Sequence, residues 1–378
     1  MGNEYLYFNA NLYEQENNAK TYDIKFISQY LNNLGLSNAV NYMSKGATSS
    51  TYNFRLFENN YTPSFIKRCI DTLSTYLNTK IIILKNTEQE SILSILISNK
   101  SRFYPKFFDY CGVLKNKPNG TMLFGLDNEN NAIYYNIQDT KSLLVAGSSG
   151  SGKSVAMNNL IESIALFSDE KKVRINLIDL KKVEFSIYQN FVIVDKFASN
   201  FNGAVSILQS MIKEIQKRYS IMEQKGIRKA TEDDFPIIIT FIDEYAELSS
   251  INQKLVDGLV SRIAQIGRAC NVYLVIATQT PTNKVISNLI RSNIQSRIGL
   301  RTTNIAQSNA ILQSRDCVDL LGMGDAYLSI DGVNGLKRVQ VFNITEKEIL
   351  SHVKCIEPKK QSKWEVFKEC IKILFGKN

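Results

Sequence analysis

Residues 147–154 read Gly147-Ser148-Ser149-Gly150-Ser151-Gly152-Lys153-Ser154, a loop of the form G-x-x-x-x-G-K-S. The segment before it, Ser142–Ala146, suits a buried parallel strand, and Val155–Leu166 after it suits a helix. Glycines let such a loop curl until its backbone N–H groups face a phosphate, where the helix adds positive potential. Strand, loop and helix together predict a nucleotide-binding site in an α/β fold. A glycine-rich surface turn is the alternative.

Each residue of this loop has an expected role. Lys153 is expected to reach the β- and γ-phosphates of ATP, and the hydroxyl of Ser154 is expected to ligate Mg²⁺. The predicted nucleotide-binding residues are Gly147, Ser148, Ser149, Gly150, Ser151, Gly152, Lys153, Ser154 and Val155.

Composition narrows the classes of protein that remain. The chain has 378 residues, 44% of them hydrophobic, which allows two domains and a sizeable core. The longest apolar stretches are too short to span a bilayer, and residues 1–6 do not read as a signal peptide or a myristoylation site. We therefore expect a cytoplasmic protein without an intrinsic membrane span, anchored, if at all, through a membrane or transfer-apparatus partner.

Side chains that could support other chemistry are few. Six scattered cysteines contain no C-x-x-C pair and are expected to be reduced thiols. A single histidine, His352, argues against a histidine zinc site or a serine–histidine triad. The net charge of +9 is compatible with a polyanionic partner but does not identify one.

The pattern along the chain predicts four segments. Residues 1–44 form a polar N-terminal extension, and 45–114 a small α+β subdomain with a helix over Pro63–Leu77. From residue 121 to 345, strands alternate with helices, which is typical of a mainly parallel sheet covered on both faces. Residues 346–378 form a short basic helical tail, whose apolar stripe suits packing on its own domain or docking of a partner. The stripe consists of Trp364, Phe367, Ile371 and Leu374.

A second motif suits the phosphate loop. The apolar strand Ile237–Ile242 ends on Asp243 and Glu244, at the sheet edge where α/β folds place ligands. Asp243 is expected to hold the Mg²⁺ hydration shell, because hard cations prefer oxygen ligands, and Glu244 to polarise the attacking water. Two acids that merely begin a loop are the alternative.

Two further residues are candidates for phosphate contacts. Gln279 follows the buried strand Val272–Ala277 and could sense the γ-phosphate, or simply satisfy a turn. Arg268 ends the amphipathic helix Lys254–Arg268; it could stabilise the developing charge at a neighbouring copy's site, or be a solvated arginine.

Ordered blocks over residues 121–345 resemble the motor domain of FtsK/SpoIIIE DNA translocases. These blocks are the phosphate loop, Ile178–Phe185 with Leu180 in place of the family's proline, Ile242–Leu248, Arg262–Ala269, Ala277–Pro281 and Leu320–Ala326. The resemblance implies a RecA-like P-loop ATPase that forms a ring, expected to be a hexamer, around double-stranded DNA. It places Arg268 as the trans-acting arginine, and it gives Asp179 and Lys181 supporting or structural roles.

The chain also departs from this family. Thr280, Ile305 and Asn309 stand where members often carry basic residues that contact DNA, although Lys284, Arg291 and Arg301 lie nearby. A C-terminal winged-helix reader is expected to be missing, which favours plasmid, conjugative or phage DNA movement over chromosome segregation. The alternatives are a protein-secretion ATPase and a nucleotide-gated assembly protein.

Overall fold

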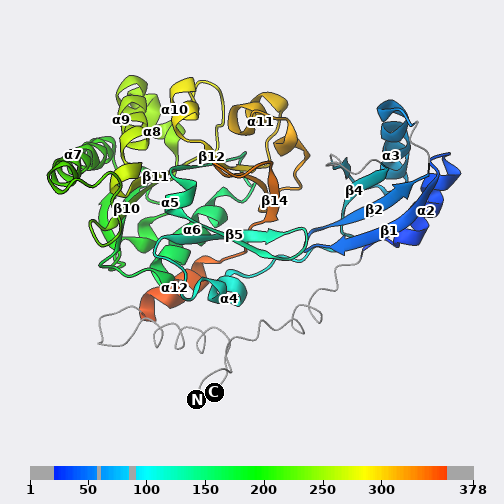
Figure 1. The fold of residues 1–378 in the computed structure, drawn as a ribbon, viewed down its shortest axis with the longest axis horizontal. Coiled ribbons are helices and arrows are strands. Elements are labelled where there is room, and N and C mark those ends of the chain that lie inside the picture. Colours follow the sequence, from blue (N-terminus) through cyan, green and yellow to red (C-terminus); the bar gives the residue numbers. More distant parts are fainter. Residues whose placement is uncertain (1–20, 58–60, 85–90, 356–378) are drawn as a thin grey trace, which may run out of the picture. The chain divides into compact units, whose positions relative to one another are not determined.

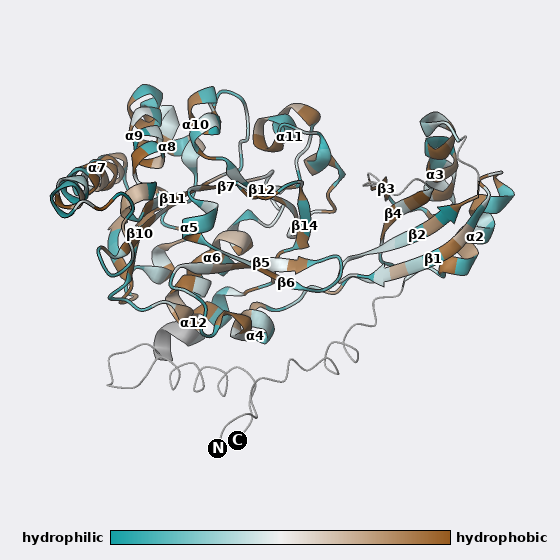
Figure 2. Ribbon diagram, viewed as in Figure 1, coloured by the Kyte–Doolittle hydropathy of each residue, from teal (hydrophilic) through white to brown (hydrophobic). Residues whose placement is uncertain are grey.

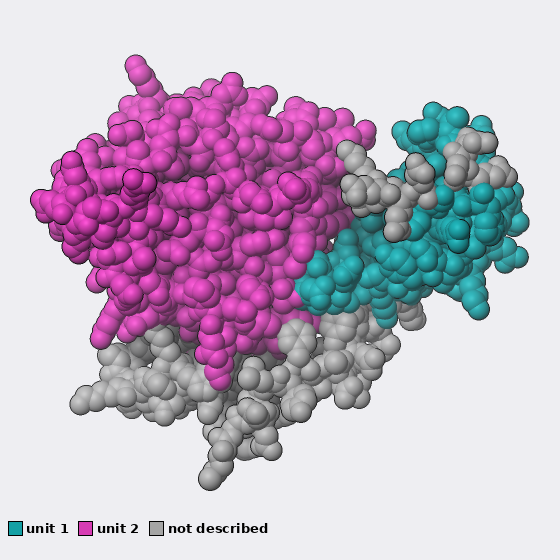
Figure 3. Space-filling model, in the orientation of Figure 1, with its two compact units in different colours: residues 1–105, 126–131 teal, residues 106–125, 132–378 magenta. Residues whose placement is uncertain are grey.

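The computed structural model describes residues 21–57, 61–84 and 91–355, with backbone alone for residues 352–355. The predicted apolar stripe of the tail and residues 1–20 of the predicted N-terminal extension lie outside this description. The chain divides into two compact units, residues 1–105 with 126–131 and residues 106–125 with 132–378 (Figure 3). Each unit has its own core and is described by itself.

Unit 1 is a four-stranded antiparallel sheet, in the order β1-β2-β4-β3, packed against two helices. Its elements are α2 (Ile24–Asn33), β1 (Asn38–Lys45), β2 (Ser49–Leu56), α3 (Pro63–Leu77), β3 (Ile81–Ile83) and β4 (Ile92–Ser98). The helices and sheet enclose an apolar core that includes Leu31, Phe54, Leu73 and Ile95. Thr62 accepts a hydrogen bond from the N–H of Phe65 and caps α3, which also has proline in its first turn.

The observed unit 1 extends beyond the predicted subdomain at its N-terminal side. The predicted start at residue 45 coincides with the end of β1, so α2 and β1 both precede it. At the other side, unit 1 ends at Pro105 rather than residue 114, and it includes residues 126–131. There Asn130 Nδ2 donates a hydrogen bond to the Lys45 carbonyl oxygen at 2.6 Å.

Unit 2 is built on a ten-stranded sheet (Figure 1). Its strands are β5 (Thr121–Asp127), β6 (Ala132–Asn136), β7 (Leu143–Ala146), β8 (Val173–Ile178), β9 (Val194–Ala198), β10 (Ile237–Ile242), β11 (Val272–Thr278), β12 (Ser296–Leu300), β13 (Asp325–Ser329) and β14 (Lys337–Gln340). Its α-helices are α4 (Phe107–Tyr110), α5 (Ile137–Thr140), α6 (Lys153–Phe167), α7 (Phe201–Lys225), α8 (Tyr245–Ile251), α9 (Gln253–Ile266), α10 (Asn288–Asn293), α11 (Ile305–Leu312) and α12 (Glu346–Cys355). Short 3-10 turns cover Cys111–Leu114, Ser186–Tyr188, Arg268–Cys270 and Asp316–Asp319.

The order of the strands determines where the polar residues meet. The sheet runs β6-β5-β14-β13-β12-β7-β11-β10-β8-β9, and the run from β12 to β9 is parallel. Strand β11 lies between β7 and β10, although it follows both in the chain. The carboxyl ends of parallel strands share one edge of a sheet. The loops after β7, β8, β10 and β11 therefore converge.

Helices cover the parallel strands with two separate sets of apolar side chains. One continuous core joins α7, α8, α9 and α10 to alternate residues of the sheet, among them Leu144 of β7 and Leu274 of β11. Helix α6 packs against β7 and β11 with its own buried residues, such as Leu160 and Ile164. In Figure 2, α7 and α9 carry both apolar and polar residues, as expected for helices with one covered face.

These observations confirm the predicted α/β fold with a mainly parallel sheet.

Helix α7 begins after Asn200, whose side chain accepts from the N–H of Gly203, and ends at Gly226 with φ +65°. Within the described residues, none of the helices combines the length and apolar character needed to cross a bilayer.

Candidate nucleotide site

The glycines of the phosphate loop have backbone conformations or neighbours that a side chain would disturb. Gly150 and Gly152 have φ +74° and +107°, a left-handed region in which residues with a Cβ are strained. A Cβ on Gly147 would lie 2.5 Å from Leu300 Cβ, and one on Gly152 would lie 2.6 Å from Gly324 N. The loop is therefore packed closely against the segments that follow β12 and precede β13.

The segment before β13 braces the loop from outside. Gly324 N–H donates to the Ser151 carbonyl oxygen at 2.8 Å, and Gly322, Met323 and Gly324 all have positive φ. The carboxylate of Asp325 accepts from Leu321 N at 2.7 Å and from the guanidinium of Arg338 at 2.6 and 2.9 Å. Asp325 and Arg338 are both buried, so this ion pair holds the segment Leu321–Gly324 in position beside the phosphate loop.

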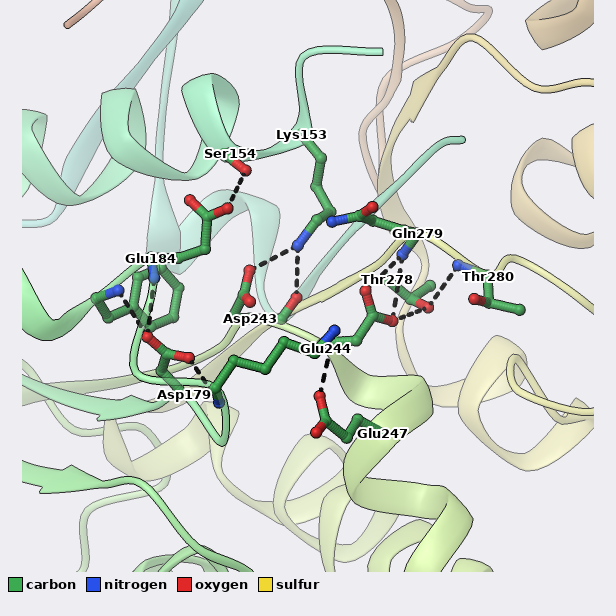
Figure 4. Close-up of polar contacts among 12 residues, drawn as sticks. Lys153, Ser154, Asp179, Glu184, Asp243, Glu244, Glu247, Thr278, Gln279 and Thr280 are labelled. Carbon is green, nitrogen blue, oxygen red and sulfur yellow. Dashed lines mark hydrogen bonds and ion pairs between the residues drawn. The ribbon is translucent and has the colours of Figure 1, made fainter. Parts of the chain in front are cut away.

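Lys153 and Asp243 form a buried ion pair at the centre of the site. Lys153 Nζ donates to Asp243 Oδ1 at 2.6 Å and to the Asp243 carbonyl oxygen at 2.8 Å (Figure 4). The two side chains are only 3% and 6% exposed. Lys153 begins α6, which follows β7, and Asp243 follows β10. Strand β11 lies between β7 and β10 in the sheet. Removing either partner would leave the other charge buried without compensation.

Glu244 is turned toward the end of β11. Its carboxylate accepts from Thr278 Oγ1 at 2.7 Å and from Gln279 N at 2.9 Å (Figure 4). Its position is supported by the next residue, because Tyr245 is fully buried and donates from its hydroxyl to Asp257 on α9. Burial, and to a smaller extent the hydrogen bond to Asp257, raises the pKa of Tyr245 far above its usual range.

A second carboxylate meets the phosphate loop from β8. Ser154 Oγ donates to Glu184 Oε1 at 2.6 Å, and Asp179 accepts from the backbone N–H groups around Glu184. Lys181 of the same loop pairs with Glu247 of α8 at 3.5 Å. The loop after β8 is thus joined both to the start of α6 and to α8.

Arg268 lies at the opposite edge of the sheet. It sits in the turn between α9 and β11, before the first residue of the strand, whereas the phosphate loop follows the last residue of β7, which runs parallel to β11. Six residue steps along β11 at about 3.3 Å each separate the two edges by about 20 Å. The Arg268 side chain is exposed and forms no ion pair within the part of the chain described.

Lys141 lies near Arg268 at this edge and forms an ion pair with Asp331. Burial, and then the positive charge of Arg268, lower the pKa of Lys141, which precedes β7 at this same edge. Gly267 allows the tight turn that presents Arg268, since a Cβ there would lie 2.3 Å from the Val272 carbonyl oxygen.

The residues that could contact DNA follow β11 and β12. Thr280 and Lys284 are exposed after β11, and Arg291 is bound through its guanidinium to Asn283 and to the Ile286 carbonyl oxygen. Ile305 and Asn309 are exposed on α11. This region touches the phosphate loop, because Ser148 N donates to the Arg301 carbonyl oxygen at 2.9 Å and Ser148 Oγ donates to Gln307 at 3.4 Å.

The site fits a nucleotide with its metal ion. Within the described ranges, the N–H groups of Ser149, Gly150 and Gly152 have no hydrogen-bond partner. The same holds for the buried hydroxyl of Ser151. The first N–H groups of α6 have no partner inside the helix and can bind an anion. Hydroxyl and carboxylate oxygens of Ser154 and Asp243 are the donors that Mg²⁺ prefers.

Sequence reasoning did not assign three of the residues that complete this site. Glu184 belongs to one of the blocks that resemble the family, but the sequence assigns no role in the nucleotide site to Glu184, Thr278 or Gln307. Their contacts depend on which strands are neighbours, and chain order does not reveal that. The Asp-x-Lys spacing after β8 was the available signal for Glu184.

Part of the chain is similar in sequence to known proteins. Residues 113–235 match the sequence model of the FtsK/SpoIIIE family. The DNA translocase FtsK of Helicobacter pylori strain J99 is 33% identical over 256 residues, which cover 65% of this chain and 30% of that protein. The DNA translocase FtsK of Tropheryma whipplei is 29% identical over 337 residues, covering 83% and 45%. The chain spans less than half the length of these relatives.

Solved structures share the fold. The pCW3 conjugation coupling protein TcpA, in a monomer form with ATPgS, has a TM-score of 0.61 at 20% identity and covers 91% of this chain and 98% of its own. The cytoplasmic domain of the type VII secretion ATPase EccC of Thermomonospora curvata has a TM-score of 0.53 at 19% identity, covering 69% and 32%. Both support a P-loop ATPase fold.

Proposed function

We propose that this chain, which carries a P-loop ATPase domain of the FtsK/SpoIIIE family, is an ATP-driven translocase of double-stranded DNA that works as a ring of copies. The placement of its charges carries this proposal. Lys153, Asp243 and Glu244 gather at one sheet edge, and Arg268 lies at the other. An arginine about 20 Å from its own phosphate loop can complete a site only in a neighbouring copy.

The residues of the site divide the reaction between them. The unpaired N–H groups of Ser149, Gly150 and Gly152, those at the start of α6 and the ammonium of Lys153 bind and orient the phosphates. Ser154 and Asp243 would hold Mg²⁺, which would supply charge neutralisation on the phosphate oxygens. Glu244 accepts a proton from the attacking water, and Gln279, whose N–H is bound to Glu244, senses the γ-phosphate.

Lys153 keeps one N–H for the nucleotide. Its ammonium has three protons, and two of them are donated to Oδ1 and to the carbonyl oxygen of Asp243. The third is available to a phosphate oxygen, so the contact with Asp243 can hold Lys153 in place while the nucleotide binds.

Coupling to DNA would pass through Ser148. Its N–H and hydroxyl connect the phosphate loop to Arg301 and Gln307, directly before and within α11. A shift of the phosphate loop would thus move the polar segment that includes Asn304 and Asn309. The net charge of +9 and the names of the curated relatives support DNA as the polymer.

Within this class, we favour plasmid or conjugative DNA movement over chromosome segregation. The fold-level likeness to TcpA, which extends over 98% of that chain, supports this choice. The division of the site between two edges supports a ring of copies, and the family resemblance favours six of them.

A protein-secretion motor is the second candidate. Thr280, Ile305 and Asn309 replace basic residues at positions where the family often contacts DNA, and the EccC domain shares the fold. The same ATPase chemistry would serve either polymer.

The decisive experiment measures the ATPase rate with long duplex DNA, with single strands and without nucleic acid, at two salt concentrations. We expect duplex DNA to stimulate hydrolysis and the stimulation to fall as salt rises, because phosphate contacts release counterions. Lys153→Ala is the inactive control. A rate that ignores duplex DNA at both salt concentrations would overturn DNA translocation and favour the secretion motor.

A further inference from the structure

We propose that Glu184 is the positioning residue for the hydroxyl of Ser154, so that this hydroxyl presents its lone pairs to the metal ion. The inference rests on the proposed function, because it concerns how the same site would hold Mg²⁺. It adds a third carboxylate to the two that follow β10.

The contact between the two side chains is short and crosses the fold. Ser154 Oγ donates to Glu184 Oε1 at 2.6 Å, and the residues are 30 positions apart. Ser154 is the second residue of α6, and Glu184 lies in the loop between β8 and the turn Ser186–Tyr188. Figure 4 shows the Glu184 carboxylate pointing at the Ser154 hydroxyl, away from the Lys153–Asp243 pair.

A hydroxyl has one proton and two lone pairs. When the proton is held by Glu184, the lone pairs of Ser154 Oγ are directed elsewhere and are free for a cation. The hydrogen bond is charge-assisted, so it also increases electron density on the hydroxyl oxygen. Partners of this kind orient metal ligands and raise their basicity.

The loop that carries Glu184 is held rigidly by Asp179. One oxygen of the Asp179 carboxylate accepts from Glu184 N and Phe185 N, both at 2.9 Å, and the other accepts from Lys181 N at 3.1 Å. Asp179 is only 1% exposed, and Phe185 and Tyr188 are fully buried. The Glu184 side chain therefore extends from a fixed backbone toward the start of α6.

The two glutamates of the site are engaged differently. Glu244 is bound to Thr278 and Gln279 at the end of β11, on the far side of the Lys153–Asp243 pair. Glu184 is bound to the phosphate-loop serine on the near side. Because the two carboxylates are separated, Glu184 can orient the Ser154 hydroxyl that would bind the metal ion, and Glu244 can accept a proton from the attacking water.

The test measures how Mg²⁺ concentration changes the binding of a fluorescent ATP analogue, mant-ATP. Four proteins are compared: the unaltered chain, Glu184→Gln, Ser154→Ala and the double variant. Glu184→Gln keeps the size and an acceptor oxygen but loses the charge. We expect it to require about 10–100-fold more Mg²⁺ for half-maximal binding. In EDTA, its affinity for mant-ATP should match that of the unaltered chain.

The double variant decides whether Glu184 acts through Ser154. If it does, Glu184→Gln should have no further effect in the Ser154→Ala background, because interacting residues are not additive. An unchanged Mg²⁺ requirement in Glu184→Gln would overturn the inference, as would an equal effect of Glu184→Gln with and without the serine hydroxyl.

Two controls keep this result separate from other failures. Asp195→Asn removes a charge from the exposed pair with Arg174 on β8 and β9, and it should leave the Mg²⁺ requirement unchanged. Thermal unfolding without nucleotide shows whether each variant is folded. If the unaltered chain itself bound mant-ATP without any Mg²⁺ dependence, the proposed ATPase function would fail first.

Discussion

The two edges of the parallel sheet in unit 2 differ in how their charges are satisfied. At the carboxyl edge, the ion pair of Lys153 with Asp243 is buried, and Glu184 and Glu244 accept hydrogen bonds from neighbouring loops. At the amino edge, Arg268 is exposed beside Lys141 and has no acidic partner in the described ranges. This difference underlies our proposal that the carboxyl edge binds phosphates and that Arg268 at the amino edge acts on a neighbouring copy.

The largest effect is expected at the carboxyl edge. Lys153→Ala should lower ATP hydrolysis by about 10³-fold, because it removes a preorganised cation from the phosphates and leaves Asp243 buried and unpaired. Steady-state phosphate release measures this. The matched control is Lys172→Ala, since Lys172 pairs with the exposed Asp233 far from the loop and should keep the rate within twofold. Retained hydrolysis in Lys153→Ala would remove the phosphate role.

Glu244→Gln should separate binding from chemistry at the same edge. We expect hydrolysis to fall by about 10²-fold, because the amide cannot accept a proton from water. The amide oxygen can still accept from Thr278 and Gln279, so affinity for the nucleotide should stay within a few-fold. Single-turnover hydrolysis and mant-ATP binding measure the two effects. Equal losses in both would mean that Glu244 supports the fold of the site instead.

Mixing variants tests whether the two edges meet between copies. Arg268→Ala and Lys153→Ala should each be inactive alone. In an equal mixture, about a quarter of the interfaces should be active, because there the copy that supplies the phosphate loop has Lys153 and its neighbour has Arg268. Mixing Lys153→Ala with Glu244→Gln is the control, since both residues belong to one edge and no site is restored. No recovery at any ratio would show that Arg268 does not act across a boundary.

The smallest expected effect is a dependence of the unfolding free energy on pH, caused by two buried thiols of unit 2. Burial raises the pKa of Cys270, beside Arg268, from 9.0 to about 11, and that of Cys317, beyond β12, from 9.0 to about 12. The unfolded thiols ionise first, so the unfolding free energy should fall between pH 9 and 11, by about 1 kcal/mol per thiol at pH 10. Urea unfolding in the presence of a reductant measures this.

Alanine variants of the two thiols check this assignment. Each should reduce the slope with pH, and Cys317→Ala should reduce it more, since the charge of Arg218 partly offsets burial at Cys270. Identical slopes in all variants would mean that other groups control the alkaline transition.

Local signals in the sequence predicted the centre of unit 2 well. The strand before the phosphate loop was expected at Ser142–Ala146 and is Leu143–Ala146, and the helix expected at Val155–Leu166 is Lys153–Phe167. Buried parallel strands and amphipathic helices carry their periodicity within a dozen residues. The predicted α/β class was confirmed for this reason, and the family resemblance was confirmed by the matching sequence model and relatives.

Strands with weak periodicity were not predicted. In β1 a bulge between Val40 and Tyr42 interrupts the alternation, and both of these apolar residues are exposed at the edge of the sheet. The contacts of Glu184 and Thr278 were also beyond prediction, because they depend on which strands lie side by side: Thr278 reaches Glu244 because β11 lies beside β10, and Glu184 reaches Ser154 from the loop after β8. That order is set by long-range packing rather than by any local pattern.

The backbone contact between Gly324 and Ser151 offers a way to observe the phosphate loop from a distant part of the chain. The Gly324 amide donates to Ser151, and the absence of a Cβ on Gly152 lets the two backbones touch. Hydrogen–deuterium exchange at this amide can occur only when the contact opens. Its protection factor would therefore report, from a residue 173 positions downstream, how often the loop releases during each round of turnover.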